Sequence, residues 1–180
     1  MEQGEAWPSP TLLAQIAFAL DADTGEIVAS AMTGNDVNDA GQVPVLLEQI
    51  DAEIASVTAD GAYDGEPVYS AVASRQSDKP PDVIIPPRSS AVPDAPASDA
   101  QSQRDRHTQF IAKKGLMAWQ KATGYDRSSL IETAIGRYKS LISPKRRART
   151  FPNQQGEIAV AVGALNRMIR VAKPVSVRVP

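Results

Sequence analysis

The sequence predicts an α/β fold in which a mixed sheet is flanked by helices and the C-terminal half is helical. Three observations support this class. Short β-prone runs alternate with helical segments in the first half, only helical spacing follows the first half, and 42% of the 180 residues are apolar. A chain of this size can bury the core of one domain, or it can form part of a larger one.

The first half of the chain begins with a predicted hairpin. Two β-prone runs, 16–20 and 26–32, flank the turn "DADTGE", in which Gly25 can adopt a left-handed conformation. The next segment, "VPVLLEQIDA", has helical spacing, and Pro44 fits a helix only in its first turn.

A strand, a helix and another strand are expected next. "IASVTADG" is a short β-branched run that ends on Asp60 and Gly61, and "GEPVYSAVASR" is a helix for which Asp64 is the expected N-terminal cap. "DVIIPPR" is then a short buried strand stopped by two prolines. The predicted order is therefore strand, strand, helix, strand, helix, strand.

The second half is predicted to be helical. Residues 88–103 are rich in Ser, Ala, Asp and Pro and are expected to form an exposed, mobile loop. Three helices follow, at about 104–121, 127–142 and 153–172. The basic loop "SPKRRART" separates the last two helices.

The helix at 127–142 keeps an acid and a base on one face. Its apolar residues recur at three-and-four spacing, which leaves Glu132 and Lys139 beside the stripe and two turns apart. The two side chains could therefore touch one ligand. Ser129 and Glu132 also match a capping box, in which the glutamate folds back onto the serine amide, and this alternative stays open on local pattern alone. The stripe comprises Leu130, Ile131, Ala134, Ile135, Tyr138, Leu141 and Ile142.

Charge is divided between the two halves of the chain. Residues 1–100 hold 3 Lys+Arg and 17 Asp+Glu, a net charge of −14, whereas residues 101–180 hold 16 and 4, a net charge of +12. A basic half is typical of a surface that meets a polyanion such as nucleic acid. The alternative is that the two halves neutralise each other within one fold.

The composition excludes several kinds of site and several classes of protein. No cysteine is present, which excludes disulfides and thiolate metal sites. No segment has the roughly 20 apolar residues of a membrane helix. The N-terminal residues carry Glu2 and Glu5 but no Lys or Arg, unlike a signal peptide, so we expect a cytoplasmic protein.

Asp60 is the first candidate for chemistry. It ends a predicted central strand, and sites in open α/β sheets gather beyond the carboxyl ends of strands. Gly61 beside it would let a ligand approach the backbone. A lone Asp-Gly pair is, however, also a common turn.

The stretches "LDADTGEIVAS", "SVTADGAYDG", "VIIPPR", "QRDRH" and "GYDRSSLIETAIGRYK" occur in this order before and within a basic C-terminal half. Together they resemble the RNase H-like catalytic domain of bacterial insertion-sequence transposases of the DDE type. The resemblance divides the chain into an atypical N-terminal segment, 1–15, and a truncated catalytic domain, 16–180.

The resemblance implies catalytic roles for two acids. The family's second catalytic aspartate falls on Asp60, and its glutamate signature puts Tyr125, Glu132 and Lys139 in register. The arginine position of the signature holds Ser128, while Arg127 stands one residue earlier, which rotates it by about 100° on a regular helix.

The family's first aspartate, on the first strand of the sheet, has no counterpart in this sequence. Asp21 and Asp23 are the nearest acids, and both are better explained as turn residues. We therefore expect that the first strand is missing, that the chain is inactive alone, and that a separately encoded N-terminal fragment could complete it.

The implied reaction is DNA cleavage and strand transfer through two Mg²⁺ or Mn²⁺ ions held by Asp60 and Glu132. A homo-oligomer is possible, and His107 and Trp119 are expected to be structural. Two alternatives remain: a non-catalytic DNA-binding remnant or regulator of transposition, and an unrelated RNase H-like nuclease. The expected DNA contacts are Tyr125, Arg127, Lys139, Lys145, Arg146, Arg147, Arg149, Arg104 and Arg106.

Overall fold

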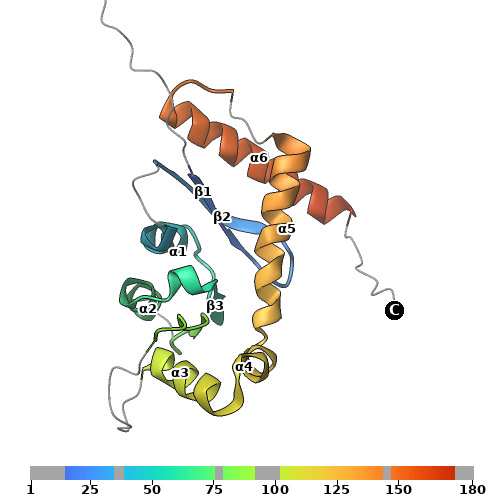
Figure 1. Ribbon diagram of the computed structural model, residues 1–180. Coiled ribbons are helices and arrows are strands. Elements are labelled where there is room, and N and C mark those ends of the chain that lie inside the picture. The colour runs from blue at the N-terminus through green and yellow to red at the C-terminus, as the bar shows by residue number, and fades with distance from the viewer. Residues whose placement is uncertain (1–14, 35–38, 76–78, 92–101, 144–146, 173–180) are drawn as a thin grey trace, which may run out of the picture.

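The structure is a computed structural model, and it describes residues 15–34, 39–75, 79–91, 102–143 and 147–172. Short strands alternate with helices in its first half, and helices alone follow (Figure 1). The α/β class with a helical C-terminal half is thus confirmed. The strands and helices are β1 (Gln15–Leu20), β2 (Ile27–Thr33), α1 (Val43–Glu48), β3 (Ser56–Thr58), α2 (Glu66–Ala73), β4 (Asp82–Ile84), α3 (Gln103–Lys114), α4 (Leu116–Thr123), α5 (Ser129–Arg137) and α6 (Phe151–Ala172). Shorter turns are η1 (Asp39–Gln42), η2 (Gly61–Tyr63), η3 (Tyr125–Ser128) and the π-helical η4 (Tyr138–Ile142).

The predicted hairpin is present as β1 and β2, which pair antiparallel. The carboxylate of Asp21 closes its turn by accepting hydrogen bonds from the Asp23 amide at 2.9 Å and the Thr24 hydroxyl at 2.7 Å. These hydrogen bonds lower the pKa of Asp21. Gly25 has a φ of 75°, as expected. Asp21 is therefore a turn residue.

The second pair of strands, β3 and β4, is parallel, as a strand–helix–strand unit requires. α2 joins the two strands, and α1 packs against α2 (Figure 1). Pro44 lies in the first turn of α1, as predicted. Apolar side chains from these elements form one core cluster, which comprises Val43, Leu47, Val68, Val72, Val83 and Ile85.

A second core lies between the hairpin and the helices α5 and α6. Phe18 of β1 stacks against Tyr138, with ring centroids 5.5 Å apart. The apolar stripe predicted for 127–142 is thus buried at Ala134 and Tyr138, whereas Leu141 is 59% exposed. The buried members of this core are Ile27, Met32, Ala134, Tyr138, Ile158, Ala161 and Leu165.

The strands differ from the expected single sheet in one respect. Parallel and antiparallel pairing both occur, but β1–β2 and β3–β4 form two separate two-stranded sheets. No ladder joins the two pairs within the described residues.

Two local predictions were wrong. The helix expected at 104–121 is two helices, because Gly115 between α3 and α4 has a φ of 83°. Asp64 does not cap α2; the N-cap is Gly65, and Asp64 is buried. The predicted mobile loop falls largely on 92–101, outside the described residues. None of the helices within the described ranges is long and apolar enough to span a membrane.

Candidate functional site

Asp60 follows β3 and is the N-cap of η2. Its Oδ1 accepts a hydrogen bond from the Ala62 amide at 2.8 Å, and the residue is exposed. Oδ2 has no hydrogen-bond partner in the described part of the chain. The adjacent Gly61 was expected to make room for a ligand, but a Cβ there would lie 3.3 Å from the carbonyl oxygen of Pro86. The approach of the Pro86 backbone therefore explains this glycine.

Glu132 lies in the first turn of α5 and is exposed. The capping-box interpretation is wrong. Ser128 is the N-cap and makes no side-chain cap hydrogen bond, and the Ser129 hydroxyl donates to the carbonyl of Asp126 at 3.0 Å. No hydrogen bond or ion pair engages the Glu132 carboxylate within the ranges that the structure covers.

Lys139 lies in the π turn that extends α5, and its side chain is exposed. Between Glu132 and Lys139, the surface at Gly136 is open, since a Cβ there would meet nothing within 4 Å. The acid and the base therefore flank an open stretch of helix surface.

The elements that carry Asp60 and Glu132 adjoin one another. β3 ends two residues before Asp60 and contacts η3, which leads directly into α5. The two acids, 72 positions apart in the sequence, thus follow segments that touch. That their carboxylates meet at one metal site remains a prediction.

Arg127 is paired rather than free. Its Nη2 lies 2.8 Å from Oδ1 of Asp23, so η3 is joined to the tip of the hairpin. Both side chains are more than half exposed, at 57% and 78%. Asp23 thus contacts a cation, while Asp21 closes the turn.

An aromatic cluster supports the segment before α5. The indole Nε1 of Trp119 donates to Nδ1 of His107 at 2.8 Å, so Nε2 of His107 carries a proton and donates to the Val83 carbonyl at 2.8 Å. Burial lowers the pKa of His107. The Tyr125 ring packs on Trp119 with centroids 5.4 Å apart. The predicted structural roles of His107 and Trp119 are confirmed.

No sequence pattern predicts the cation that pairs with the buried Asp64. Asp64 has a fully buried side chain that accepts hydrogen bonds from Arg104 Nε at 2.8 Å and Nη2 at 3.3 Å. It also accepts from the Arg88 amide at 3.0 Å. Asp64 therefore ties the loop after β3, the loop after β4 and the start of α3 together. A role for Arg104 in phosphate binding remains a prediction, and its guanidinium must serve that role while it holds Asp64.

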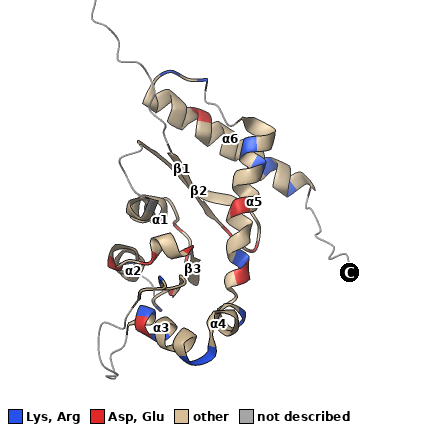
Figure 2. Ribbon diagram, in the orientation of Figure 1, with Lys and Arg blue, Asp and Glu red and all other residues tan. Residues whose placement is uncertain are grey.

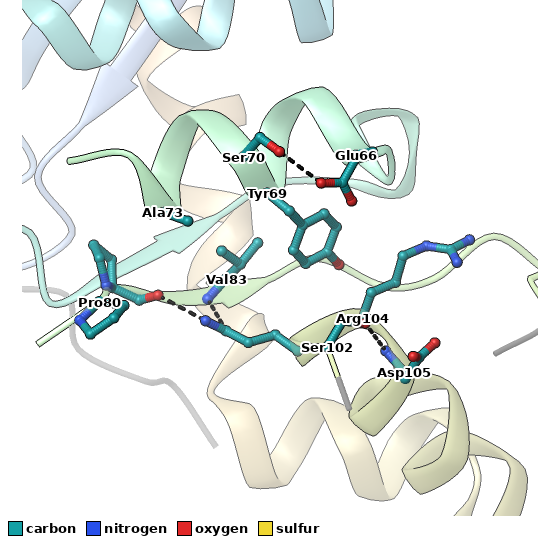
Figure 3. A pocket seen from close by; sticks show the side chains of 11 residues that line it. Glu66, Tyr69, Ser70, Ala73, Pro80, Val83, Ser102, Arg104 and Asp105 are labelled. Carbon is teal, nitrogen blue, oxygen red and sulfur yellow. Dashed lines mark hydrogen bonds between the residues drawn. The ribbon is translucent and has the colours of Figure 1, made fainter. Parts of the chain in front are cut away.

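A cavity of about 310 Å³ lies between α2 and the start of α3, away from the predicted catalytic acids (Figure 3). Tyr69 projects into it, and its buried hydroxyl makes no hydrogen bond within the described residues. Burial raises the pKa of Tyr69 to about 12. Neither Asp60 nor Glu132 lines the cavity.

The basic loop before α6 is anchored by an acid of that helix. The Glu157 carboxylate accepts hydrogen bonds from the amides of Arg147, at 3.0 and 3.1 Å, and Ala148, at 2.9 Å. Arg147 and Arg149 are exposed, and Arg106 is exposed on α3. Basic segments gather on α3 to α6 (Figure 2). Lys145 and Arg146 lie outside the described residues.

These features describe an α/β protein with exposed acids on adjoining elements and a basic C-terminal half. Residues 12–167 match the family described as the Transposase DDE domain. The match covers well over half of the sequence, so the chain belongs to this family and has a transposase role. No solved structure matches the chain.

Proposed function

We propose that this chain is the C-terminal catalytic portion of a DDE transposase, which cleaves DNA and joins its 3' end to a new site. One observation carries the proposal: the elements before Asp60 and Glu132 touch, and both carboxylates are exposed within a chain of this family. Reactions at phosphorus of this kind depend mainly on positioning and on charge neutralisation.

The two acids suit a divalent cation in their chemistry. Mg²⁺ and Mn²⁺ prefer carboxylate oxygens, and Asp60 keeps one such oxygen free of protein hydrogen bonds while Glu132 keeps both, within the described residues. When bound, two such ions activate the attacking oxygen and stabilise the leaving one. No group of three possible metal-ligating side chains occurs among the described residues.

Lys139 would hold a phosphate beside this metal site. It stands seven residues beyond Glu132, about 10 Å along the helix, and an ammonium neutralises a phosphate as a point charge. The open surface at Gly136 lets a DNA backbone pass between the two side chains. The helix would thus present a metal ligand and a phosphate ligand on one face.

The basic loop would bind DNA without reading its sequence. Arg147 and Arg149 are exposed cations on a loop anchored by Glu157, which suits contacts to phosphates. Lys145 and Arg146 belong to the same run in the sequence. Arg106 on α3 and Arg127 and Tyr125 on η3 would extend this surface.

The chain is proposed to be inactive by itself. The third acid expected from the resemblance is not replaced by Asp21 or Asp23, because the first closes the hairpin turn and the second pairs with Arg127. With Mg²⁺ or Mn²⁺ and DNA that carries the element's ends, the purified chain should bind DNA without cutting it. Addition of a polypeptide that carries the first strand and its aspartate should produce cleavage.

Matched variants test the assignment of the acids. Asp60→Asn and Glu132→Gln should abolish the complemented cleavage, whereas Asp51→Asn and Glu48→Gln, which neutralise other acids at exposed positions, should not change it. Cleavage by the chain alone, lost on either of the first two substitutions, would show that the third acid is not required. Cleavage that survives both substitutions would reject the two acids as metal ligands.

The engagement of Asp21 and Asp23 also favours a second candidate, a non-catalytic DNA-binding regulator of transposition. Such a chain would bind the element's ends and reduce the activity of an intact transposase. It would show no cleavage under any complementation.

A further inference from the structure

His107 joins two parts of the fold through the two nitrogens of one imidazole. Nε2 donates to the Val83 carbonyl of β4 at 2.8 Å, and Nδ1 accepts from the Trp119 indole of α4 at 2.8 Å. This tautomer follows from chemistry, because an indole nitrogen can only donate a hydrogen bond. The neutral imidazole therefore satisfies both of its partners at once.

The Val83 side of this bridge leads to Asp60. Val83 faces Val57 in the parallel pair of β4 and β3, and the Ile84 carbonyl accepts a hydrogen bond from the Ala59 amide at 3.3 Å. Asp60 is the next residue along the chain. The strand that His107 contacts is thus the strand that holds the segment before Asp60 in place.

The Trp119 side of the bridge leads to Glu132. Trp119 is 1% exposed, and its ring packs on the ring of Tyr125, with centroids 5.4 Å apart. Tyr125 begins η3, which runs directly into α5 and therefore to Glu132 (Figure 1). A displacement of the indole would consequently move the start of the helix that carries Glu132.

A second proton on His107 is incompatible with one half of the bridge. That proton would lie on Nδ1, where it would meet the N–H of Trp119, and two donors cannot share a hydrogen bond. A buried donor without a partner is unfavourable, so the indole would have to move. Nε2 keeps its proton in both forms, so the contact with Val83 would remain.

The surroundings of the imidazole favour its neutral form. Burial lowers the pKa of His107 and is the largest influence, and the cation Arg106 of α3 acts in the same direction. The carboxylates of Asp82 in β4 and Asp64 beyond η2 act in the opposite direction. α4 faces the ring with the uncharged Trp119. The bridge is therefore complete at neutral pH, and protonation belongs to mildly acidic pH, below about 6.5.

We infer that His107 is a positioning residue whose neutral imidazole holds the segments of Asp60 and Glu132 in one arrangement. A second proton on the imidazole releases the Glu132 segment. The Asp60 side stays in place, because α3 is also tied to Asp64 through Arg104 at 2.8 Å. This inference rests on the proposed function only for its consequence for cleavage.

NMR titration of the full chain from about pH 7.5 to about pH 5 tests the release without any catalysis. The indole N–H of Trp119 and the amides of η3 and of the first turn of α5 should shift with the midpoint of the His107 imidazole, below about pH 6.5. Trp119→Phe assigns the indole resonance, since the chain has two tryptophans. The amide of Ala29, buried in the hairpin, should not move.

Two outcomes of this titration would overturn the inference. Titration of His107 without a shift in η3 and α5 would confine its role to the contact between α3 and α4. A shift of Ala29 with the same midpoint would mean that the whole fold opens.

Matched variants separate the titration from its transmission. His107→Gln removes the titrating group, so the amides of η3 should no longer shift. Trp119→Phe keeps a ring against Tyr125 but removes the N–H. The His107 midpoint should then rise by about 0.5 to 1 unit, because the neutral form loses one hydrogen bond, and the shifts in η3 should lose most of their amplitude.

The control for both variants is Ile158→Val, which removes one buried methylene from the other core and should leave every midpoint unchanged. Shifts in η3 that survive His107→Gln or Trp119→Phe at full amplitude would overturn the inference.

Cleavage separates this inference from the proposed function. One pH unit below the midpoint found by NMR, complemented cleavage by the wild type should be about tenfold lower relative to His107→Gln, because only about a tenth of the chains keep a neutral imidazole. Equal pH profiles would overturn the positioning role and leave the catalytic proposal standing. Coupled titration without cleavage by any complement would reject the catalytic proposal and support the bridge.

Discussion

Asp64 and Asp60 stand four residues apart and have opposite environments. The side chain of Asp64 is fully buried and bonded to Arg104 and the Arg88 amide, whereas Asp60 is exposed and makes one side-chain hydrogen bond, with the Ala62 amide. A buried carboxylate is tolerated only when it is paired, and a paired carboxylate has little capacity left for a metal. The comparison separates charges that hold the fold from charges that are available for chemistry.

The largest effect is expected from Asp64→Ala. It should lower the free energy of unfolding by about 3 kcal/mol, the low end of the range for a broken buried pair, because the Arg104 side chain is 20% exposed and keeps some contact with water. Urea denaturation measures this decrease. The double variant Asp64→Leu/Arg104→Met leaves no unpaired charge and should recover much of the stability. If Asp64→Ala lowered the free energy of unfolding by less than about 1 kcal/mol, Asp64 would not be an acid that holds the fold together.

The cations also divide into those that stabilise the fold and those that are available to bind DNA. Replacement of Lys145, Arg146, Arg147 and Arg149 by Ala should weaken binding to all DNA sequences and flatten the log-log salt dependence. The slope should fall by about 0.9 for each phosphate that the protein no longer neutralises. Arg104→Ala should act mainly on stability instead.

The control for this experiment removes four other positive charges, at Lys113, Lys114, Lys121 and Arg167. It lowers the net charge equally but leaves the loop intact, so the salt slope should stay close to that of the wild type. Equal flattening in both variants would mean that only net charge matters.

A pH effect of intermediate size is expected from His107. Burial lowers its pKa in the folded state, so below the unfolded value of about 6.5 the unfolded chain binds more protons. Stability should be full above about pH 6.5 and fall as the pH drops, by at most about 1.4 kcal/mol per unit. Asp21 and Glu26, whose hydrogen bonds lower their pKa, lose their contributions only at lower pH, below about 4.

His107→Gln should remove this dependence of stability on pH, because an amide does not titrate. The glutamine still offers a donor to Val83 and an acceptor to Trp119. Denaturation at pH values from about 5 to about 7 gives the comparison. A slope that persists in the variant would assign the titration to another group.

The smallest effect on stability is expected at Asp60. Asp60→Ala removes the cap of η2 and should cost about 0.5 to 1 kcal/mol, whereas Asp60→Asn keeps the cap and should leave stability unchanged. Both should abolish complemented cleavage. A decrease of several kcal/mol in the free energy of unfolding of Asp60→Ala would mean that Asp60, like Asp64, stabilises the fold.

The candidate site was only partly predictable. The signature helix exposes Glu132 and Lys139 as its apolar stripe predicts, since side-chain direction in a helix follows from its period. Local pattern could not decide between a capping box and an exposed glutamate, because the choice depends on where the helix begins. Here η3 precedes α5, and Ser128 is the N-cap without a side-chain hydrogen bond.

The sequence by itself determined the order of the elements, the hairpin turn and the family, because periodicity, turn residues and motifs are local signals. Tertiary structure decided which polar side chains form hydrogen bonds and ion pairs within the fold. Asp64 meets Arg104 across 40 positions, and Asn166 closes the edge at Ile27 across 139. Residues so far apart form no periodic pattern in the sequence that would predict their contact. Only the folded chain brings them together.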